Sequence, residues 1–350
     1  MIREGIQKLI EGTNLTYEES RAVMTEVMSG KATNAQTAAF LTILRMRGES
    51  VEELLAFASV MRGHCHQIRP KIQGRLVDTC GTGGDKLKTF NVSTTAAFVI
   101  AGTGIPVAKH GNRAVTSKSG SADVLEKLGL NLTLKPQTVE AIIEQIGVGF
   151  MFAPLFHPAM KYAAETRHEI GIRTIFNLLG PLTNPACASA QLLGVYDSKL
   201  VTPIAYALQK LDCDEAMVVH GLDGLDEIST VGKTLIAHLK EGSVVKTEFS
   251  PSDFGIKKAE ISELYCSSVE ENAEILFRIL NGKAVDAQLD VVLVNSAAGI
   301  LIGGKADSFK EAIELARKSI ESGVAYGKLK ELVRASGGNL EPLEMLEEKQ

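Results

Sequence analysis

From Leu76 onward, short apolar runs alternate with segments of helical periodicity, and this alternation constrains the fold more than any other feature of the chain. Strands are predicted at 75–79, 105–109, 130–134, 148–152, 191–196 and 215–220. Helices are predicted at 136–146, 199–211, 269–280, 287–302, 308–321 and 326–335. Such alternation produces βαβ units, so we expect an α/β fold with a mostly parallel central sheet flanked by helices. Residues 233–248 instead predict a hairpin that turns at Glu241-Gly242.

The segment before this alternation is predicted to be helical throughout. Thr16-x-x-Glu19 and Ser50-x-x-Glu53 have the pattern of capping boxes, which mark helix starts. Breaks near 12–14, 30–34 and 48–50 divide the segment into four short helices. We therefore expect a small all-helical domain at 1–72, joined by helices near 165–185, and a large α/β domain at 73–350.

Three polar loops rich in hydrogen-bond donors follow the first predicted strands. They are 81–85 (GTGGD), 91–94 (NVST) and 109–121 (KHGNRAVTSKSGS). Glycine lets backbone N–H groups approach a ligand closely, and a helix start presents free N–H groups with a positive dipole end. Turns between strands and helices also favour Gly, Ser and Asp, but three such loops within 45 residues indicate a phosphate-binding site.

The charge of this stretch supports the same interpretation. Between Val77 and Ser121 the sequence contains five cations and two anions. The cations are Lys86, Lys88, Lys109, Arg113 and Lys118, and the anions are Asp78 and Asp85. The stretch therefore carries +3 within a chain whose net charge is −5. A local positive pocket in an acidic protein suits a small polyanion better than a long nucleic acid.

The order and spacing of these motifs resemble the anthranilate phosphoribosyltransferase family of tryptophan biosynthesis. The motifs are GTGGD, NVST, KHGNR and SKSGSADVLE, followed by HPAMKYAAETRHEIGIRTIFNLLGPLTNP from His157 and GLDGLDEIS from Gly221. The resemblance extends over nearly the whole chain. It implies a magnesium-dependent glycosyltransferase that moves the phosphoribosyl group of 5-phosphoribosyl 1-pyrophosphate (PRPP) onto the amine of anthranilate.

The resemblance also implies which residues bind PRPP. They are Gly81, Gly84, Asp85, Thr89, Asn91, Val92, Ser93, Thr94, Lys109, His110, Gly111, Asn112, Arg113, Ala114, Val115, Thr116, Ser117 and Ser121. Which loop holds the 5′-phosphate and which the pyrophosphate does not follow from the sequence. Transfer of the ribosyl group passes through a state with oxocarbenium character, so the main task is to neutralise the departing pyrophosphate. Lys109 brings a full positive charge to that task.

Asp226-Glu227 is the expected magnesium site. Paired carboxylates suit Mg²⁺, which also takes oxygens of substrate phosphates. A DE pair in a glycine-rich loop is on its own usually a solvated turn, but this pair and the hydroxyl of Ser93 match the metal ligands that the resemblance implies.

The resemblance places anthranilate at Gly81, Asn112 and Arg167. An arginine can hold a carboxylate through two parallel hydrogen bonds. His110 and His157 can line the same pocket. His110 is a hypothetical general base. A strong base is not required, because an aromatic amine loses its proton readily once attack is under way.

Composition limits the location and the partners of the protein. The five cysteines are scattered and lack metal-site spacing, and the amino-terminal segment carries charges where a signal peptide is apolar. No apolar run approaches the length of a membrane span. We expect a cytoplasmic homodimer that pairs through the helical domain and binds neither nucleic acid nor membrane.

Two other functions compete with the transferase. A pyrimidine nucleoside phosphorylase shares the helical-plus-α/β plan but needs only inorganic phosphate, whereas the Asp226-Glu227 pair and the GTGGD and NVST loops suit pyrophosphate with magnesium. A non-catalytic nucleic-acid-binding relative would need a basic surface. This chain has 37 basic and 42 acidic side chains, which disfavours that function. A dinucleotide-binding fold is disfavoured because the first loop is not GxGxxG.

Overall fold

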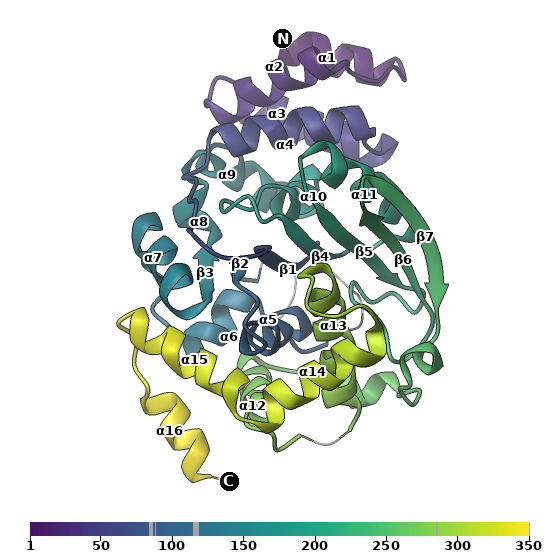
Figure 1. Cartoon of the computed structure of the whole chain (residues 1–350). Coiled ribbons are helices and arrows are strands. Elements are labelled where there is room, and N and C mark those ends of the chain that lie inside the picture. The colour runs from purple at the N-terminus through teal and green to yellow at the C-terminus, as the bar shows by residue number, and fades with distance from the viewer. Residues whose placement is uncertain (84–86, 88, 115–118, 285, 350) are drawn as a thin grey trace.

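The computed structural model describes residues 1–83, 87, 89–114, 119–284 and 286–349. Its amino-terminal part is a bundle of short helices, coloured purple in Figure 1. These are α1 (Ile2–Ile10), α2 (Tyr17–Met28), α3 (Asn34–Arg47) and α4 (Val51–Gly63). The predicted helices and the breaks between them are confirmed.

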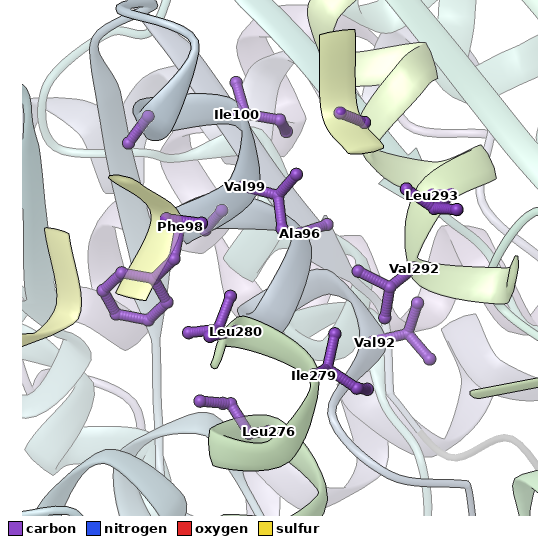
Figure 2. Close-up of a cluster of buried hydrophobic side chains, with 14 of the residues drawn as sticks. Val92, Ala96, Phe98, Val99, Ile100, Leu276, Ile279, Leu280, Val292 and Leu293 are labelled. Atoms are coloured by element: carbon purple, nitrogen blue, oxygen red, sulfur yellow. The ribbon is translucent and has the colours of Figure 1, made fainter. Parts of the chain in front are cut away.

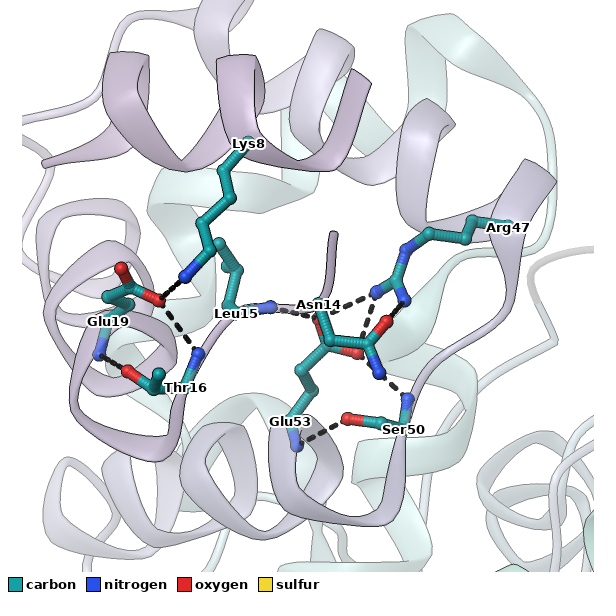
Figure 3. A network of polar contacts seen from close by, with 8 residues as sticks. All are labelled: Lys8, Asn14, Leu15, Thr16, Glu19, Arg47, Ser50 and Glu53. Atoms are coloured by element: carbon teal, nitrogen blue, oxygen red, sulfur yellow. Dashed lines mark hydrogen bonds and ion pairs between the residues drawn. The ribbon is translucent and has the colours of Figure 1, made fainter. Parts of the chain in front are cut away.

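Both predicted capping boxes are present. The hydroxyl of Thr16 accepts the N–H of Glu19 at 3.3 Å, and the Glu19 carboxylate accepts the N–H of Thr16 at 2.8 Å. Ser50 and Glu53 make the same reciprocal pair at 3.2 and 2.8 Å (Figure 3). A further box at Thr33 and Gln36 starts α3. Each box satisfies two N–H groups that a helix start leaves without an intrahelical partner.

Glu53 also joins three parts of the bundle. Its side chain is fully buried, and both of its oxygens accept from Nη2 of Arg47 at 2.6 Å (Figure 3). Its Oε1 accepts the N–H of Leu15 at 3.0 Å as well. A buried carboxylate needs such compensation for its lost hydration, so this network fixes the loop between α1 and α2 against the start of α4.

Within the described residues seven strands form one sheet in the order β3-β2-β1-β4-β5-β6-β7. They are β1 (Val77–Gly81), β2 (Val107–Gly111), β3 (Val148–Phe152), β4 (Ala190–Gly194), β5 (Glu215–Gly221), β6 (Thr234–Lys240) and β7 (Ser243–Phe249). Strands β3, β2, β1, β4 and β5 run parallel, and the β6–β7 hairpin adds to β5 antiparallel. The mostly parallel sheet and the hairpin at Glu241-Gly242 are thus confirmed.

The predicted strand at 130–134 is wrong. This segment is a loop that begins at Gly129, whose φ of +95° turns the chain. The apolar Leu130 and Leu132 are buried, which explains the strand-like alternation. The backbone bonds elsewhere, because the N–H of Asn131 donates to Oγ of Ser336 at 3.2 Å and the carbonyl of Gly129 accepts the N–H of Asn339.

One face of the sheet is covered by helices around a central buried helix, α5 (Val92–Gly102). The others are α6 (Ser121–Lys127), α12 (Val269–Leu280), α13 (Ala287–Ile302), α14 (Phe309–Glu321) and α15 (Val324–Ala335). Figure 2 shows Val99 and Ile100 of α5 among Leu280 of α12 and Leu293 of α13. Helix α13 can approach this closely because a Cβ at Gly299 would overlap Ile100.

The opposite face packs against the helical bundle through two helices, α10 (Ile175–Leu182) and α11 (Val201–Lys210). Before them come α8 (Ala153–Phe156) and α9 (Lys161–Ile170), and α9 contacts α2 and α3. One apolar core runs from Phe57 of α4 to Val218 of β5. The helical bundle is therefore not an isolated unit, although the boundary after residue 72 stays a prediction.

The remaining elements lie at the periphery. Helix α7 (Pro136–Ile146) flanks β3, and α16 (Glu341–Glu348), which the sequence analysis does not anticipate, ends the chain (Figure 1). Short 3-10 helices occur at Pro158–Met160, Ser198–Leu200, Pro251–Phe254 and Ile261–Leu264. No helix among the described residues has the length and apolar character needed to cross a membrane.

Candidate active site

A cavity of about 680 Å³ opens at the carboxyl ends of β1, β2 and β5, where ligands of parallel sheets bind. Most of the predicted site residues line it. They are Gly81, Thr89, Asn91, Val92, Ser93, Thr94, Lys109, His110, Gly111, Asn112, Arg113, Ala114, Ser121, Asp226 and Glu227. The predicted residues Gly84, Asp85, Val115, Thr116 and Ser117 lie outside the described residues, as do Lys86, Lys88 and Lys118.

The amino end of α5 faces this cavity. Asn91 precedes the helix, but its side chain does not cap it among the described contacts. The N–H of Ser93 instead donates to Oε1 of Glu227 at 3.1 Å. The carboxylate therefore lies where the helix dipole and the first-turn N–H groups favour an anion.

Lys109 points from β2 toward the same helix start. It is only 4% exposed, and its Nζ donates to the carbonyl of Thr79 at 2.5 Å and contacts Oγ of Ser93 at 3.4 Å. Burial lowers the pKa of Lys109, while the carboxylates of Asp78 and Glu227 oppose that shift. An ammonium held in so dry a place interacts more strongly with a bound anion than it would in water.

Arg113 is oriented toward protein carboxylates. Its guanidinium pairs with Asp123 at 3.2 Å and with Glu126 at 2.6 Å, and these acids raise its pKa. Both acids belong to α6. The positive charge counted from the sequence is therefore partly neutralised, and Lys109 is the cation that the described part of the cradle directs inward.

Asp226 and Glu227 follow β5 and are each 8% exposed. Oδ2 of Asp226 accepts the N–H of Gly83 at 2.9 Å. Two glycines make room for this loop, since a Cβ at Gly194 would overlap the Asp226 backbone and a Cβ at Gly81 would come within 2.6 Å of Oδ2 of Asp226. The pair is thus built into the floor of the cavity.

This acidic pair fits Mg²⁺. Two adjacent carboxylates and the nearby Ser93 hydroxyl are hard oxygen donors of the kind that Mg²⁺ takes. The described residues contain no group of three or more His, Cys, Asp or Glu able to hold a metal. A Mg²⁺ ion here would need further oxygens from substrate phosphates and water, which is the mode of binding expected at a phosphate site.

His110 lies beside His157, with ring centroids 5.0 Å apart. Burial and the neighbouring His157 lower the pKa of His110 to about 3, and burial lowers the pKa of His157 to about 4. Nε2 of His110 and both ring nitrogens of His157 are buried without a hydrogen-bond partner among the described residues. Neutral imidazoles with low pKa are weak bases, so this environment favours contact with a ligand over proton transfer.

Arg167 does not line the cavity in the described structure. It lies on α9 with its guanidinium 5.3 Å from the centroid of the Phe176 ring, and burial lowers its pKa. The described residues provide it with no ion-pair partner. Arg173, which the sequence analysis does not single out, lines the cavity instead and stacks on Tyr196 at 4.8 Å.

Other lining residues also escape the sequence analysis. They are Gly171 and Asn177, near α9 and α10, and Cys266, Ser268 and Asn272, at the start of α12. The sequence around these residues contains no pattern that indicates a phosphate site. Only the fold brings α12 beside the loops that follow β1 and β2.

Comparison with known proteins agrees with this geometry. Residues 73–326 match the glycosyl transferase family, a/b domain, and residues 3–65 match the glycosyl transferase family, helical bundle domain. The anthranilate phosphoribosyltransferase of Methanocorpusculum labreanum is 51% identical over 97% of this chain and 99% of its own. That of Petrotoga mobilis is 50% identical over 94% of this chain and 95% of its own.

Solved structures share the fold. The anthranilate phosphoribosyltransferase of Thermus thermophilus superimposes with a TM-score of 0.88 at 40% identity, over 95% of this chain and 99% of that one. The Saccharomyces cerevisiae enzyme in complex with PRPP and Mg gives a TM-score of 0.89 at 30% identity, over 96% of this chain and 98% of that one. The chain therefore belongs to the anthranilate phosphoribosyltransferase family.

Proposed function

We propose that this protein transfers the phosphoribosyl group of PRPP to the amine of anthranilate, giving N-(5-phosphoribosyl)anthranilate and pyrophosphate in tryptophan biosynthesis. The observation that carries the proposal is the convergence of the α5 helix start, Lys109 and the Asp226-Glu227 pair on one cavity. Relatives across nearly the full length carry this enzyme name, and a Saccharomyces relative binds PRPP and Mg.

The proposed roles of the residues follow from where each lies. The N–H groups of Gly81 and of the first turn of α5, with the side chains of Asn91, Ser93 and Thr94, bind phosphate oxygens. Lys109 stabilises the negative charge that develops as pyrophosphate leaves, because a buried cation acts strongly across a water-poor site. Thr89, Gly111, Asn112, Arg113, Ala114 and Ser121 surround the same substrate.

Asp226, Glu227 and Ser93 are proposed to hold Mg²⁺ together with the oxygens of pyrophosphate. The ion, when bound, supplies positive charge to the leaving group. Carboxylates that hold the ion would release the N–H groups of Gly83 and Ser93, which would then be available to phosphate.

Anthranilate is proposed to bind beside Gly81 and Asn112, with its carboxylate on Arg167. The buried guanidinium of Arg167 without a described acidic partner supports this role. His110, whose pKa is about 3, remains the hypothetical base and is better suited to orient the acceptor. A His110→Ala variant with near-normal kcat and an unchanged pH profile would remove it as a base. A related Saccharomyces structure binds 4-fluoroanthranilate.

The same fold family makes a pyrimidine nucleoside phosphorylase the competing function. Product analysis separates the two. Mass spectrometry after incubation with anthranilate, PRPP and Mg²⁺ should detect N-(5-phosphoribosyl)anthranilate, and incubation of thymidine or uridine with inorganic phosphate should release no free base. The reverse pattern would establish the phosphorylase and refute the transferase.

We also propose that the protein is a cytoplasmic homodimer joined through the helical bundle. Ile10 on α1 and Met46 on α3 are 63% and 83% exposed, so both are available to a partner at such an interface. All five cysteines are free, as expected in a reducing compartment. Sedimentation equilibrium should give twice the chain mass, and Met46→Asp should shift the species to the monomer.

A further inference from the structure

Asn272 belongs to none of the motifs singled out in the sequence, yet it is among the most buried polar side chains of the cavity wall. It belongs to the first turn of α12 and is 1% exposed. Cys266 and Ser268 precede it along the same wall. Because it is so buried, its effect on a ligand must pass through the residues that it contacts.

The amide of Asn272 makes hydrogen bonds in both directions to one residue. Its Nδ2 donates to Oδ1 of Asn91 at 2.6 Å, and its Oδ1 accepts the backbone N–H of Asn91 at 3.1 Å. The side chain and the main chain of Asn91 are thereby fixed together. Because Oδ1 of Asn91 accepts from Asn272, the Asn91 side chain does not cap α5, and the helix start is left to the Glu227 carboxylate or to a bound anion.

A second loop meets the same amide. Nδ2 of Asn272 contacts Oγ of Ser119 at 3.3 Å, and Oγ of Ser119 donates to Oδ1 of Asn91 at 3.4 Å. Asn91 belongs to the NVST loop and Ser119 to the loop between β2 and α6. One side chain, 181 residues away from Asn91, therefore holds two of the three phosphate loops in register.

We propose that Asn272 is a positioning residue that aligns Asn91 and Ser119 for PRPP. The proposal rests on the assignment of PRPP to this cavity and adds a residue of α12 to its support. It follows that the loss of Asn272 weakens PRPP binding more than anthranilate binding, because the anthranilate residues Asn112 and Arg167 make no described contact with it.

The amide is required rather than polarity alone. In Asn272→Asp the carboxylate still accepts the N–H of Asn91, but it cannot donate to Oδ1 of Asn91 and it brings a negative charge toward the phosphate loops. In Asn272→Ala both bonds are lost. We therefore expect the aspartate variant to bind PRPP at least as weakly as the alanine variant.

The test is calorimetric titration of each full-length variant with PRPP and Mg²⁺ in the absence of anthranilate. Asn272→Ala and Asn272→Asp should raise the Kd for PRPP by about tenfold or more, as expected for lost hydrogen bonds at a phosphate site. The matched control is Glu270→Gln, two residues away on α12, whose exposed ion pair with Lys127 at 3.0 Å should leave the Kd within about twofold.

A double-variant cycle separates positioning from a general loss of structure. If Asn272 acts through Asn91, then Asn272→Ala should change the Kd for PRPP little in an Asn91→Ala background. Equal effects in both backgrounds, or an unchanged Kd in both single variants, would overturn the proposal. PRPP binding without transfer to anthranilate would refute the proposed acceptor and leave this test intact.

Discussion

The backbone N–H of Ser93 and the carboxylate of Glu227 are joined by a hydrogen bond of 3.1 Å, so an acidic side chain lies at the helix start where phosphate is expected. The N–H of Gly83 and Oδ2 of Asp226 repeat this arrangement at 2.9 Å. The two carboxylates thus bind the donors of the cradle themselves. Binding of PRPP with Mg²⁺ would transfer the carboxylates to the metal and the N–H groups to phosphate.

This relationship predicts a specific effect of Glu227→Gln. The amide is a poorer Mg²⁺ ligand but no longer repels phosphate, so transfer should fall by about 100-fold or more. Affinity for pyrophosphate measured without Mg²⁺ should equal or exceed that of the unaltered protein. Calorimetry with pyrophosphate, with and without Mg²⁺, checks both statements, and an unchanged gain in affinity from Mg²⁺ would contradict the assigned metal site.

Gly194→Ala should disturb the proposed metal site by displacing the loop that carries Asp226 and Glu227. The added Cβ would overlap the Asp226 backbone, so the acidic loop must shift, at a cost of about 1–3 kcal/mol in folding free energy. We expect weaker Mg²⁺-dependent PRPP binding together with a lower urea midpoint. Gly327→Ala is the matched control, since nothing lies within 4 Å of its Cβ position in helix α15. It should be neutral or stabilising by about 0.5–1 kcal/mol.

Arg167 should act on anthranilate alone. Arg167→Lys keeps a positive charge but loses the planar fork, so the KM for anthranilate should rise about tenfold while the KM for PRPP changes little. Arg21→Lys is the matched control, because Arg21 also lies over an aromatic ring, at 5.9 Å from Tyr17, but on the helical bundle. Equal effects on both substrates would show that Arg167 acts on the fold instead. An Arg173→Lys variant tests the arginine that lines the described cavity.

The histidine pair predicts a loss of stability in acid. The pKa values of about 3 for His110 and about 4 for His157 lie below the ordinary 6.5, so the unfolded chain binds protons first as pH falls. Their contribution to stability is thus present above pH 6.5 and is lost as the pH falls to about 4 for His157 and to about 3 for His110. Within its window, each histidine lowers the free energy of unfolding by up to about 1.4 kcal/mol for each pH unit of acidification.

His157→Gln removes one member of the pair. The difference in unfolding free energy between the two proteins, measured with urea from pH 4 to pH 8, should therefore shrink on the acid side. Parallel stability curves for the two proteins over the range would show that His157 takes up its proton equally in the folded and unfolded states.

The sequence predicts most elements where local signals are strong. The periodicity and the Pro136 helix start place α7 at its observed bounds, and the stripes of apolar residues do the same for α12 and α13. The strand predicted at 130–134 is wrong because Leu130 and Leu132 alternate like a strand, while the backbone groups of Gly129 and Asn131 bond to the turn after α15. Alternation reports burial, and pairing depends on partners that are distant in sequence.

The site residues likewise fall into those that the sequence predicts and those that only the structure reveals. The glycine-rich loops, Lys109 and the acidic pair carry their chemistry in short motifs, so they can be found in the sequence and the fold gathers them. Asn272 and Arg173 have no such motif. Arg113 looks like a free cation in the sequence, and only the structure shows Asp123 and Glu126 around it.

The measurement that tests the central claim most directly is the fluorescence of anthranilate after PRPP and Mg²⁺ are added to the purified protein. We predict a decay that requires all three components, stops with EDTA and is lost in an Asp226→Ala, Glu227→Ala double variant. Stable fluorescence with a folded protein that binds PRPP would contradict anthranilate as the acceptor.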